Sequence, residues 1–212
     1  MRMGPEHGIY LASRSPRRRE LLAQISVRFH LLLFRALLQS DSEVDEAVLA
    51  AEAPRDYVAR VARAKAEAGW RRVLQRRLPR APVLAADTTV ALEERILGKP
   101  ADRREAAAML GTLSGRRHQV FTAVAVKFEE RIELAVCASE VEFRPLTGDE
   151  IRDYLASGEA DDKAGAYAIQ GRAAQFVRDM HGSYSGVMGL PLYETAQLLD
   201  KIDSRNERRN PH

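Results

Sequence analysis

Lysine is rare in this chain, which carries most of its positive charge on arginine. A lysine ammonium is a compact point charge, whereas an arginine guanidinium is a planar fork, so the two side chains suit different ligands. In a chain that otherwise uses arginine, a lysine indicates a position where a compact charge is wanted. Three of the chain's five lysines lie in the motifs that carry its candidate chemistry: Lys65, Lys99 and Lys163.

The tripeptide Gly98-Lys99-Pro100 places a lysine between the two residues that most constrain a loop. A lysine on such a loop is well placed to meet a phosphate. The segment does not match the Walker A motif, which needs a longer glycine-rich loop.

The polar segment from Ser13 to Arg18 is typical of an anion site at the start of a helix. Ser15 is a suitable N-cap and Pro16 suits the first helical position. Free backbone N–H groups and the positive end of the helix dipole favour an anion there, and Arg17 and Arg18 could add bidentate contacts to phosphate oxygens. The alternative is an ordinary capped surface helix, which the spacing alone favours.

A carboxylate and two hydroxyls, Asp87, Thr88 and Thr89, directly follow an apolar run at 83–86 that predicts a strand buried on both faces. Ligands of open α/β sheets often bind beyond the carboxyl ends of the strands. Asp87 could therefore hold a divalent cation or activate a water molecule. The alternative, favoured when the motif is taken alone, is an Asx-turn that caps the next element.

The segment 162–171 combines small residues, which allow close approach, with the amide of Gln170. An amide offers both a donor and an acceptor, so Gln170 could read the edge of a nucleobase. A tight turn with a surface amide explains the segment equally well.

Other kinds of site are not favoured. His118 and His181 have no histidine or cysteine partner at ligand spacing, so a zinc site is not expected. Cys137 lies in an apolar, strand-like run and fits a core position better than a nucleophile. No Gly-x-Ser-x-Gly elbow occurs.

Hydrophobic periodicity, capping residues and turns predict the elements that position these residues. Expected helices cover residues 17–24, 56–78, 103–113, 148–156 and 191–199, and two of them begin with capping boxes. Expected strands cover 9–12, 28–34, 83–86, a hairpin of 89–92 with 96–97, and an antiparallel pair of 118–128 with 132–143. This order predicts an elongated, mixed-sheet α/β fold with two lobes around a central cleft.

Composition limits the class of protein. The 212 residues are 45% hydrophobic and 30% charged, which excludes general disorder and allows one domain, expected over 1–203 with a polar tail at 204–212. The net charge is only +3 and few aromatics accompany the arginine clusters, so nucleic acid is not an expected partner.

No apolar run approaches the roughly 20 residues of a membrane span, and no signal peptide is evident. A single cysteine, Cys137, suits a reducing cytoplasm.

Taken in order, motifs along nearly the whole chain resemble the Maf (septum-formation inhibitor) family of nucleoside triphosphate pyrophosphatases. The matching stretches are LASRSPRRRELL, VDE, YVARVARAKAEAG, LAADTTV, LGKPADRREAAAMLGTLSGRRHQVFTAVAV, GEADDKAGAYAIQGRAAQFV and GSYSGVMGLPLYET. The resemblance implies a fold similar to that of inosine triphosphate pyrophosphatases. It also implies that water attacks the α-phosphorus of a small-molecule nucleoside triphosphate, assisted by Mg²⁺ or Mn²⁺, and it suggests a homodimer.

The resemblance also implies roles for individual residues. Asp87 matches the proton acceptor, and Glu46 matches an acidic residue that would bind the metal with Asp87. The phosphate-binding positions are matched by Ser13, Arg18, Lys65 and Lys99. The positions tied to base selection are matched by Arg17, Thr88 and Gln170.

The family has branches, and this chain is similar to the one that acts on dTTP and UTP. It reads Ala86-Asp87-Thr88 and Ile169-Gln170-Gly171, as that branch does. We therefore expect a pyrophosphatase active on dTTP and UTP, with modified pyrimidine nucleotides as further substrates. The rivals are a purine house-cleaning enzyme acting on inosine or 7-methyl-guanosine triphosphates, a nucleotide-binding regulator of septum formation with little turnover, and a nucleic-acid-binding module.

Overall fold

A mixed sheet forms the centre of the computed structural model, which describes residues 8–32 and 44–207. The strand order is β2-β1-β3-β5-β6-β7, with β4 paired to β3. β1 runs parallel to β2 and β3, and the other pairs are antiparallel. The strands are β1 (Ile9–Leu11), β2 (Phe29–Leu31), β3 (Val83–Leu92), β4 (Arg95–Leu97), β5 (Arg117–Phe128), β6 (Arg131–Phe143) and β7 (Val177–His181).

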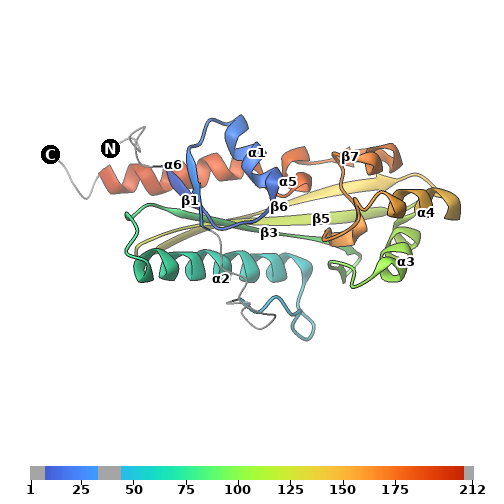
Figure 1. The fold of residues 1–212 in the computed structure, drawn as a ribbon, viewed down its shortest axis with the longest axis horizontal. Coiled ribbons are helices and arrows are strands. Elements are labelled where there is room, and N and C mark those ends of the chain that lie inside the picture. Colours follow the sequence, from blue (N-terminus) through green and yellow to red (C-terminus); the bar gives the residue numbers. More distant parts are fainter. Residues whose placement is uncertain (1–7, 33–43, 208–212) are drawn as a thin grey trace.

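Helices cover the sheet in a way that differs between its two ends (Figure 1). α2 (Pro54–Gln75) lies along one face, while α1 (Pro16–Gln24), α5 (Tyr184–Met188) and α6 (Leu192–Glu207) lie on the other. α3 (Arg103–Leu113) and α4 (Gly148–Ala156) gather at the far end, with the short 3₁₀ turns η1 (Ala164–Ala166) and η2 (Arg172–Phe176). None of the helices within 8–32 and 44–207 is long and apolar enough to cross a bilayer.

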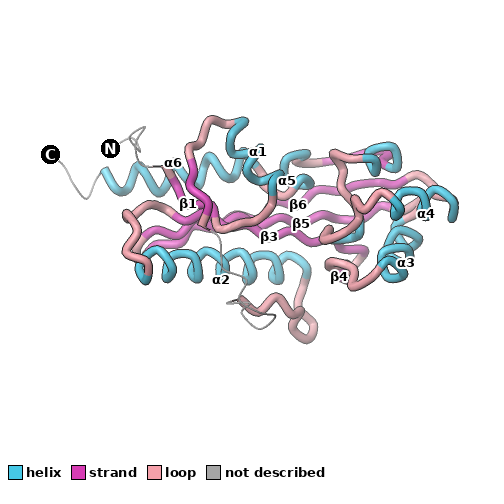
Figure 2. The backbone as a smooth tube through the Cα atoms, viewed as in Figure 1, coloured by secondary structure: helices cyan, strands magenta, loops and turns pink. Residues whose placement is uncertain are grey.

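The long strands run between two groups of helices at the two ends of the sheet (Figure 2). At one end, α2 packs on β3 and β5, and α1 and α6 pack on the opposite face of the same strands. At the other end, α3, α4 and both 3₁₀ turns enclose a cluster of aromatic and aliphatic side chains. β3 and β5 are buried along most of their length because helices or turns cover both of their faces.

An open stretch of sheet edge lies between these two ends. β1 pairs with β3 only as far as Leu84, whose oxygen accepts from Ala12 N at 2.8 Å. β4 begins to pair at Val90. Within the described residues, no strand pairs with this edge of β3 between the two points, and that stretch contains Asp87 and Thr88.

The expected mixed-sheet α/β class is confirmed, and most predicted elements are present. Both capping boxes begin helices, although Glu105 bonds to Ala101 N rather than to the N-cap nitrogen. The hairpin of β3 with β4 and the pair of β5 with β6 occur as expected. α2 begins at Pro54 and ends at Gln75, so it is shifted toward the N-terminus relative to the prediction.

Two further predictions differ from the structure, and one helix was not predicted. Asp87 does not follow a strand or form an Asx-turn, because β3 continues through it to Leu92. The last predicted helix runs eight residues further, to Glu207, into the segment expected to be a tail. α5 was not predicted, since one turn of helix leaves no periodicity to detect. The remainder of the predicted tail (208–212) and positions 33–34 of the predicted second strand lie outside the described residues.

Candidate active site

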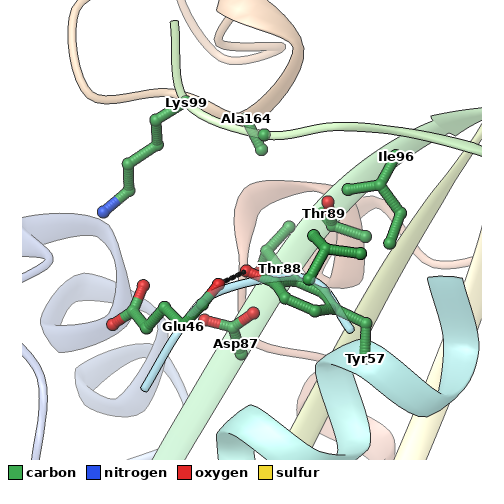
Figure 3. A pocket seen from close by; sticks show the side chains of 10 residues that line it. Glu46, Tyr57, Asp87, Thr88, Thr89, Ile96, Lys99 and Ala164 are labelled. Atoms are coloured by element: carbon green, nitrogen blue, oxygen red, sulfur yellow. Dashed lines mark hydrogen bonds between the residues drawn. The ribbon is translucent and has the colours of Figure 1, made fainter. Parts of the chain in front are cut away.

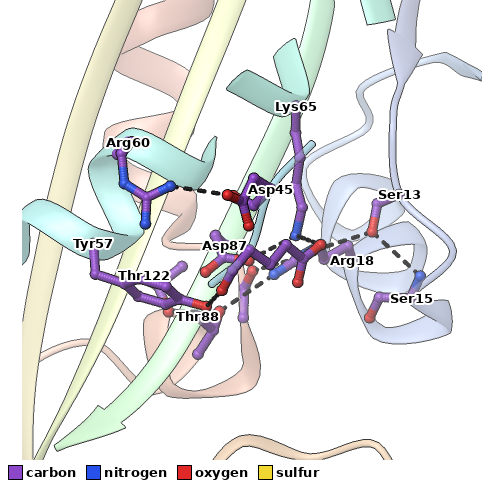
Figure 4. A network of polar contacts seen from close by, with 12 residues as sticks. Ser13, Ser15, Arg18, Asp45, Tyr57, Arg60, Lys65, Asp87, Thr88 and Thr122 are labelled. Carbon is purple, nitrogen blue, oxygen red and sulfur yellow. Dashed lines mark hydrogen bonds and ion pairs between the residues drawn. The ribbon is translucent and has the colours of Figure 1, made fainter. Parts of the chain in front are cut away.

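An ion-paired lysine on the buried face of α2 forms the centre of the site. Lys65 Nζ lies 2.8 Å from Asp87 Oδ1 and 2.9 Å from Glu46 Oε1 (Figure 4). Helical spacing puts Lys65 on the same face as Val61 and Ala62, which are fully buried. One ammonium therefore joins a carboxylate of β3 to a carboxylate of the loop before α2.

Two side chains of α2 hold the loop that carries Glu46. Tyr57 Oη donates to the backbone oxygen of Glu46 at 3.0 Å. Arg60 donates to the carbonyl oxygens of Asp45 at 3.1 Å and Ala47 at 2.8 Å, and its guanidinium lies over the Tyr57 ring. The backbone on both sides of Glu46 is thus tied to α2, which directs the carboxylate toward Lys65.

The electrostatics of this group favour an ionised Glu46 and a protonated Tyr57. Burial acts to raise the pKa of Glu46, but Lys65, Lys99 and Arg18 together hold that pKa below its ordinary value. Burial, followed by the charges of Asp87 and Glu46, raises the pKa of Tyr57 to about 12. The phenol therefore keeps its proton at neutral pH and can donate to the Glu46 carbonyl.

A second cation approaches the same part of β3 from the opposite face. Thr88 follows Asp87 in the strand, so the two side chains point to opposite sides of the sheet. Arg18 of α1 donates to Ser13 Oγ at 3.1 Å, to Thr88 Oγ1 at 3.3 Å and to the Gly189 carbonyl at 2.8 Å. Burial lowers the pKa of Arg18, and the charge of Asp87 opposes that effect.

The neighbouring hydrogen bonds determine which group receives the proton of the Thr88 hydroxyl. Thr122 Oγ1 donates to the Gly186 carbonyl at 2.8 Å, and it lies 2.9 Å from Thr88 Oγ1. Because the Thr122 hydroxyl donates its proton to the Gly186 carbonyl, Thr122 Oγ1 can only accept a hydrogen bond from Thr88. Thr88 in turn accepts from Arg18, so a chain of hydrogen bonds links α1, β3, β5 and α5.

A pocket of about 280 Å³ opens beside the ion pairs (Figure 3). The side chain of Lys99, from the loop after β4, extends toward this pocket, and Thr89 Oγ1 is buried in its wall with no partner among the described residues. The pocket is lined by Glu46, Val48, Tyr57, Asp87, Thr88, Thr89, Ile96, Gly98, Lys99 and Ala164.

Gln170 lies outside this lining but contacts the residue next to Arg18. With its amide oxygen turned toward α1, Gln170 accepts from Arg17 Nη1 at 3.0 Å and Nε at 3.1 Å. Lys163 is close enough that Arg17 and Lys99 add to the effect of burial in lowering its pKa. Cations from three segments, represented by Arg17, Lys99 and Lys163, are therefore close enough to affect one another.

The donor groups fit a divalent cation that is bound together with substrate phosphates. Mg²⁺ commonly takes one or two carboxylates, several waters and phosphate oxygens. Glu46 and Asp87 supply the two carboxylates, and no cluster of three or more acidic, histidine or cysteine ligands occurs in the described part of the chain. Such a cation would share these carboxylates with Lys65.

The structure brings the predicted site residues to one region, although their roles stay predictions. Ser13, Arg18 and Thr88 form one group of contacts, and Glu46, Lys65 and Asp87 form another. Lys99 lies at the pocket, and Arg17 contacts Gln170.

Sequence reasoning missed three residues that hold the site together: Tyr57, Arg60 and Thr122. Spacing could have revealed one clue, because a lysine at position 65 falls on the apolar stripe of an amphipathic helix. The loop contacts of Arg60 and the cross-strand position of Thr122 depend on the fold and leave no local signal.

Comparisons with known proteins identify the family of this chain. The family model described as "Maf-like protein" matches residues 8–202. The chain belongs to the Maf family. A Maf relative from Aromatoleum aromaticum, named dTTP/UTP pyrophosphatase, is 58% identical over 92% of this chain and 95% of its own length. A relative of the same name from Nitrosomonas europaea is 56% identical over 91% of this chain and 93% of its own length.

A solved structure, the Ham1 protein of Staphylococcus aureus, is also similar to this Maf chain. It is 16% identical, with a TM-score of 0.44, and the match covers 64% of this chain and 71% of Ham1.

Proposed function

We propose that this chain hydrolyses dTTP and UTP to the nucleoside monophosphate and pyrophosphate. The observation that carries the proposal is the junction of Lys65 with Glu46 and Asp87, beside a pocket that Lys99 and Arg18 approach from other segments. A triphosphate needs several converging cations, and its hydrolysis needs a group that accepts a proton from water. The names of the Maf relatives support the same substrates.

Asp87 is the proposed proton acceptor. A water held by its carboxylate would attack the α-phosphorus, forming a new P–O bond while the bond from the α-phosphorus to the bridging oxygen breaks. The proton of the water passes to Asp87, and pyrophosphate leaves with the bridging oxygen. Asp87 lies in a buried strand, which fixes its position relative to the pocket.

The cations have separate roles in this proposal. Lys65 orients the Asp87 carboxylate and compensates its charge. Lys99 and Arg18 would bind the phosphates and compensate the negative charge that develops on the leaving group. Ser13 holds one end of the Arg18 guanidinium and so directs the other end toward Thr88.

Glu46 and Asp87 would together hold a Mg²⁺ or Mn²⁺ ion with the bound triphosphate. Such an ion, when bound, supplies charge neutralisation at the phosphates. Loss of turnover on chelation, restored by added Mg²⁺, would support this part of the proposal, and turnover that persists in EDTA would contradict it.

Base selection would depend on the amide of Gln170. Since its oxygen accepts from Arg17, its NH₂ points away from the guanidinium and can donate to a base carbonyl. Thymine and uracil carry a carbonyl at C4, whereas cytosine carries an amino group there. Thr88 would contribute through the contact that it shares with Arg18.

A panel of nucleoside triphosphates with pyrophosphate as the readout, run with and without Mg²⁺, tests the proposal. We expect turnover of dTTP and UTP well above that of dCTP and of purine nucleotides. Preferred turnover of inosine or 7-methyl-guanosine triphosphates would assign a purine house-cleaning function. Tight dTTP binding without pyrophosphate release would assign a regulatory role.

The cellular location and the oligomeric state of the enzyme are part of the same proposal. We expect a cytoplasmic location, which suits a chain whose single cysteine, Cys137, is free and buried. A homodimer is also expected, and sedimentation of the purified chain would test it.

A further inference from the structure

The turn that carries Gln170 has no regular secondary structure to fix it. Gln170 lies between the 3₁₀ turns η1 and η2, and its side chain is exposed. An exposed amide on a free turn would sample many orientations and discriminate poorly between bases. Selection through Gln170 therefore requires contacts that fix the backbone on both sides of it.

Three hydrogen bonds supply those contacts. Ala168 N donates to Tyr154 Oη at 3.2 Å, and Gly171 N donates to the Ala168 carbonyl at 3.0 Å, which closes the turn. On the other side, Arg172 N donates to Glu159 Oε2 at 2.7 Å. Tyr154 lies in α4 and Glu159 lies three residues after the end of that helix, so α4 and the loop that follows it anchor the two ends of the turn.

The carboxylate of Glu159 also occupies the space beside Gly171. A Cβ added at Gly171 would overlap with Glu159 Oε2, far inside van der Waals contact. The absence of a side chain at position 171 therefore allows Glu159 to reach Arg172 N. The same carboxylate thus accepts from the first backbone N–H of η2.

We propose that Glu159 is a positioning residue for base selection: it anchors the turn so that Gln170, whose oxygen is held by Arg17, presents its NH₂ to a base carbonyl. This inference rests on the proposed function, because it concerns how the same site distinguishes dTTP and UTP from dCTP. Glu159 acts through the backbone at Arg172 and does not itself touch the substrate.

Two substitutions remove the anchor by different means. Glu159→Ala deletes the acceptor, and Gly171→Ala displaces the carboxylate from its place beside the turn. Glu159→Gln is the conservative variant, because an amide oxygen can still accept from Arg172 N. Asp153→Asn is a matched control, since it removes one exposed negative charge from α4 without removing a contact to the turn.

The experiment measures kcat and KM for dTTP, UTP and dCTP, the inhibition constant of pyrophosphate, and the melting temperature of each variant. For Glu159→Ala and Gly171→Ala we expect the KM for dTTP to rise about tenfold and the preference for dTTP over dCTP to fall by a similar factor, as loss of one well-made hydrogen bond allows. The values of kcat and the pyrophosphate inhibition constant should stay within about twofold. Glu159→Gln and Asp153→Asn should behave as the unchanged protein does.

Two results would overturn this inference and leave the proposed function standing. One is an unchanged dTTP-to-dCTP preference in Glu159→Ala while the unchanged protein turns over dTTP. The other is an equal loss of kcat on all three substrates with a lowered melting temperature, which would make Glu159 a purely structural residue. If the unchanged protein fails to release pyrophosphate from dTTP or UTP, the proposed function falls, and this inference falls with it.

Discussion

Asp87 and Lys65 form one partly buried ion pair, so changing either residue alters the surroundings of the other. Asp87→Asn is the sharper test because it keeps the size of the side chain and an oxygen for Lys65 to bond. We expect kcat for dTTP to fall by about 10²–10⁴, the range that removal of a general base produces. The measurement is pyrophosphate release at saturating dTTP.

Thermal unfolding provides the control for this prediction. Lys65 retains its contact with Glu46 in the variant, so the fold should persist and the melting temperature should change little. Unchanged turnover in Asp87→Asn would remove Asp87 from the reaction. A variant that does not fold would be replaced by Asp87→Glu, which keeps the charge but moves the carboxylate and should lower kcat.

Gln170→Glu tests the direction of the proposed hydrogen bond to the base. A carboxylate at position 170 would pair with Arg17, so the turn should remain in place, but the donor NH₂ would become an acceptor. We expect the KM for dTTP and UTP to rise by about tenfold or more. The kcat/KM for dCTP should rise relative to that for dTTP, since the amino group of cytosine can donate to the carboxylate. Gln175→Glu makes the same charge change at another exposed position and should leave base preference unaltered.

At the scale of single elements, Gly165 joins two loops of the site. Its N–H donates to the Gly98 carbonyl at 3.0 Å, beside Lys99, and its φ of 66° is in the left-handed region. A Cβ there would lie 2.8 Å from a methyl group of Val90. Gly165→Ala should therefore destabilise the protein by about 2–4 kcal/mol, from backbone strain and overpacking, and raise the KM for dTTP as Lys99 shifts.

Denaturant unfolding and dTTP kinetics check this prediction against Gly111→Ala. Gly111 lies in α3, and an added Cβ meets no atom within 4 Å, so alanine should stabilise that helix by about 0.5–1 kcal/mol. Equal stability of the two variants would contradict the role assigned to Gly165.

The elements were predictable where local physics determines them. The capping residues Asp102 and Thr147 begin helices as expected because the hydrogen bonds that they make lie within four residues of chain. The position of Asp87 was not predictable in the same way. Polar residues normally end a buried strand, but here β3 continues through Asp87 because Lys65, which lies on another element, compensates the carboxylate.

The whole site shows the same limit of local reasoning. Residue types identified phosphates as the expected ligands of the site, but no pattern placed Arg18 and Lys65 on opposite faces of one strand. That arrangement depends on the sheet order, in which β1 leaves the edge of β3 beyond Leu84 open.

At the scale of the whole molecule, the far part of the core holds a histidine whose charge state depends on folding. His118 of β5 is 2% exposed, its Nε2 lies 2.9 Å from Tyr167 Oη, and its ring packs against Phe143. Burial lowers the pKa of His118 from 6.5 to about 4. Below pH 6.5 the unfolded chain therefore binds a proton that the native protein does not bind.

The contribution of neutral His118 to stability is fully present above pH 6.5 and is lost as the pH falls toward 4. A shift of this size corresponds to about 3 kcal/mol of unfolding free energy across the window. The carboxylates with lowered pKa values, Glu46, Glu52 and Glu150, lose their contributions only below about pH 4.5, where carboxylates begin to protonate in the unfolded chain. The decline in unfolding free energy between pH 6.5 and 4.5 can therefore be attributed to His118.

His118→Gln tests this attribution because glutamine can bond to Tyr167 but cannot titrate. Denaturant unfolding at a series of pH values should show the unfolding free energy of the unchanged protein declining from pH 6.5 to 4.5, and a much flatter profile for the variant. The variant should be less stable than the unchanged protein at pH 7.5, since a flexible amide fills the aromatic cluster less well, and the two profiles should converge toward pH 4.5. Parallel profiles would show that His118 is already protonated in the native protein, and would contradict the burial that the packing of β5 against Phe143 and Tyr167 imposes.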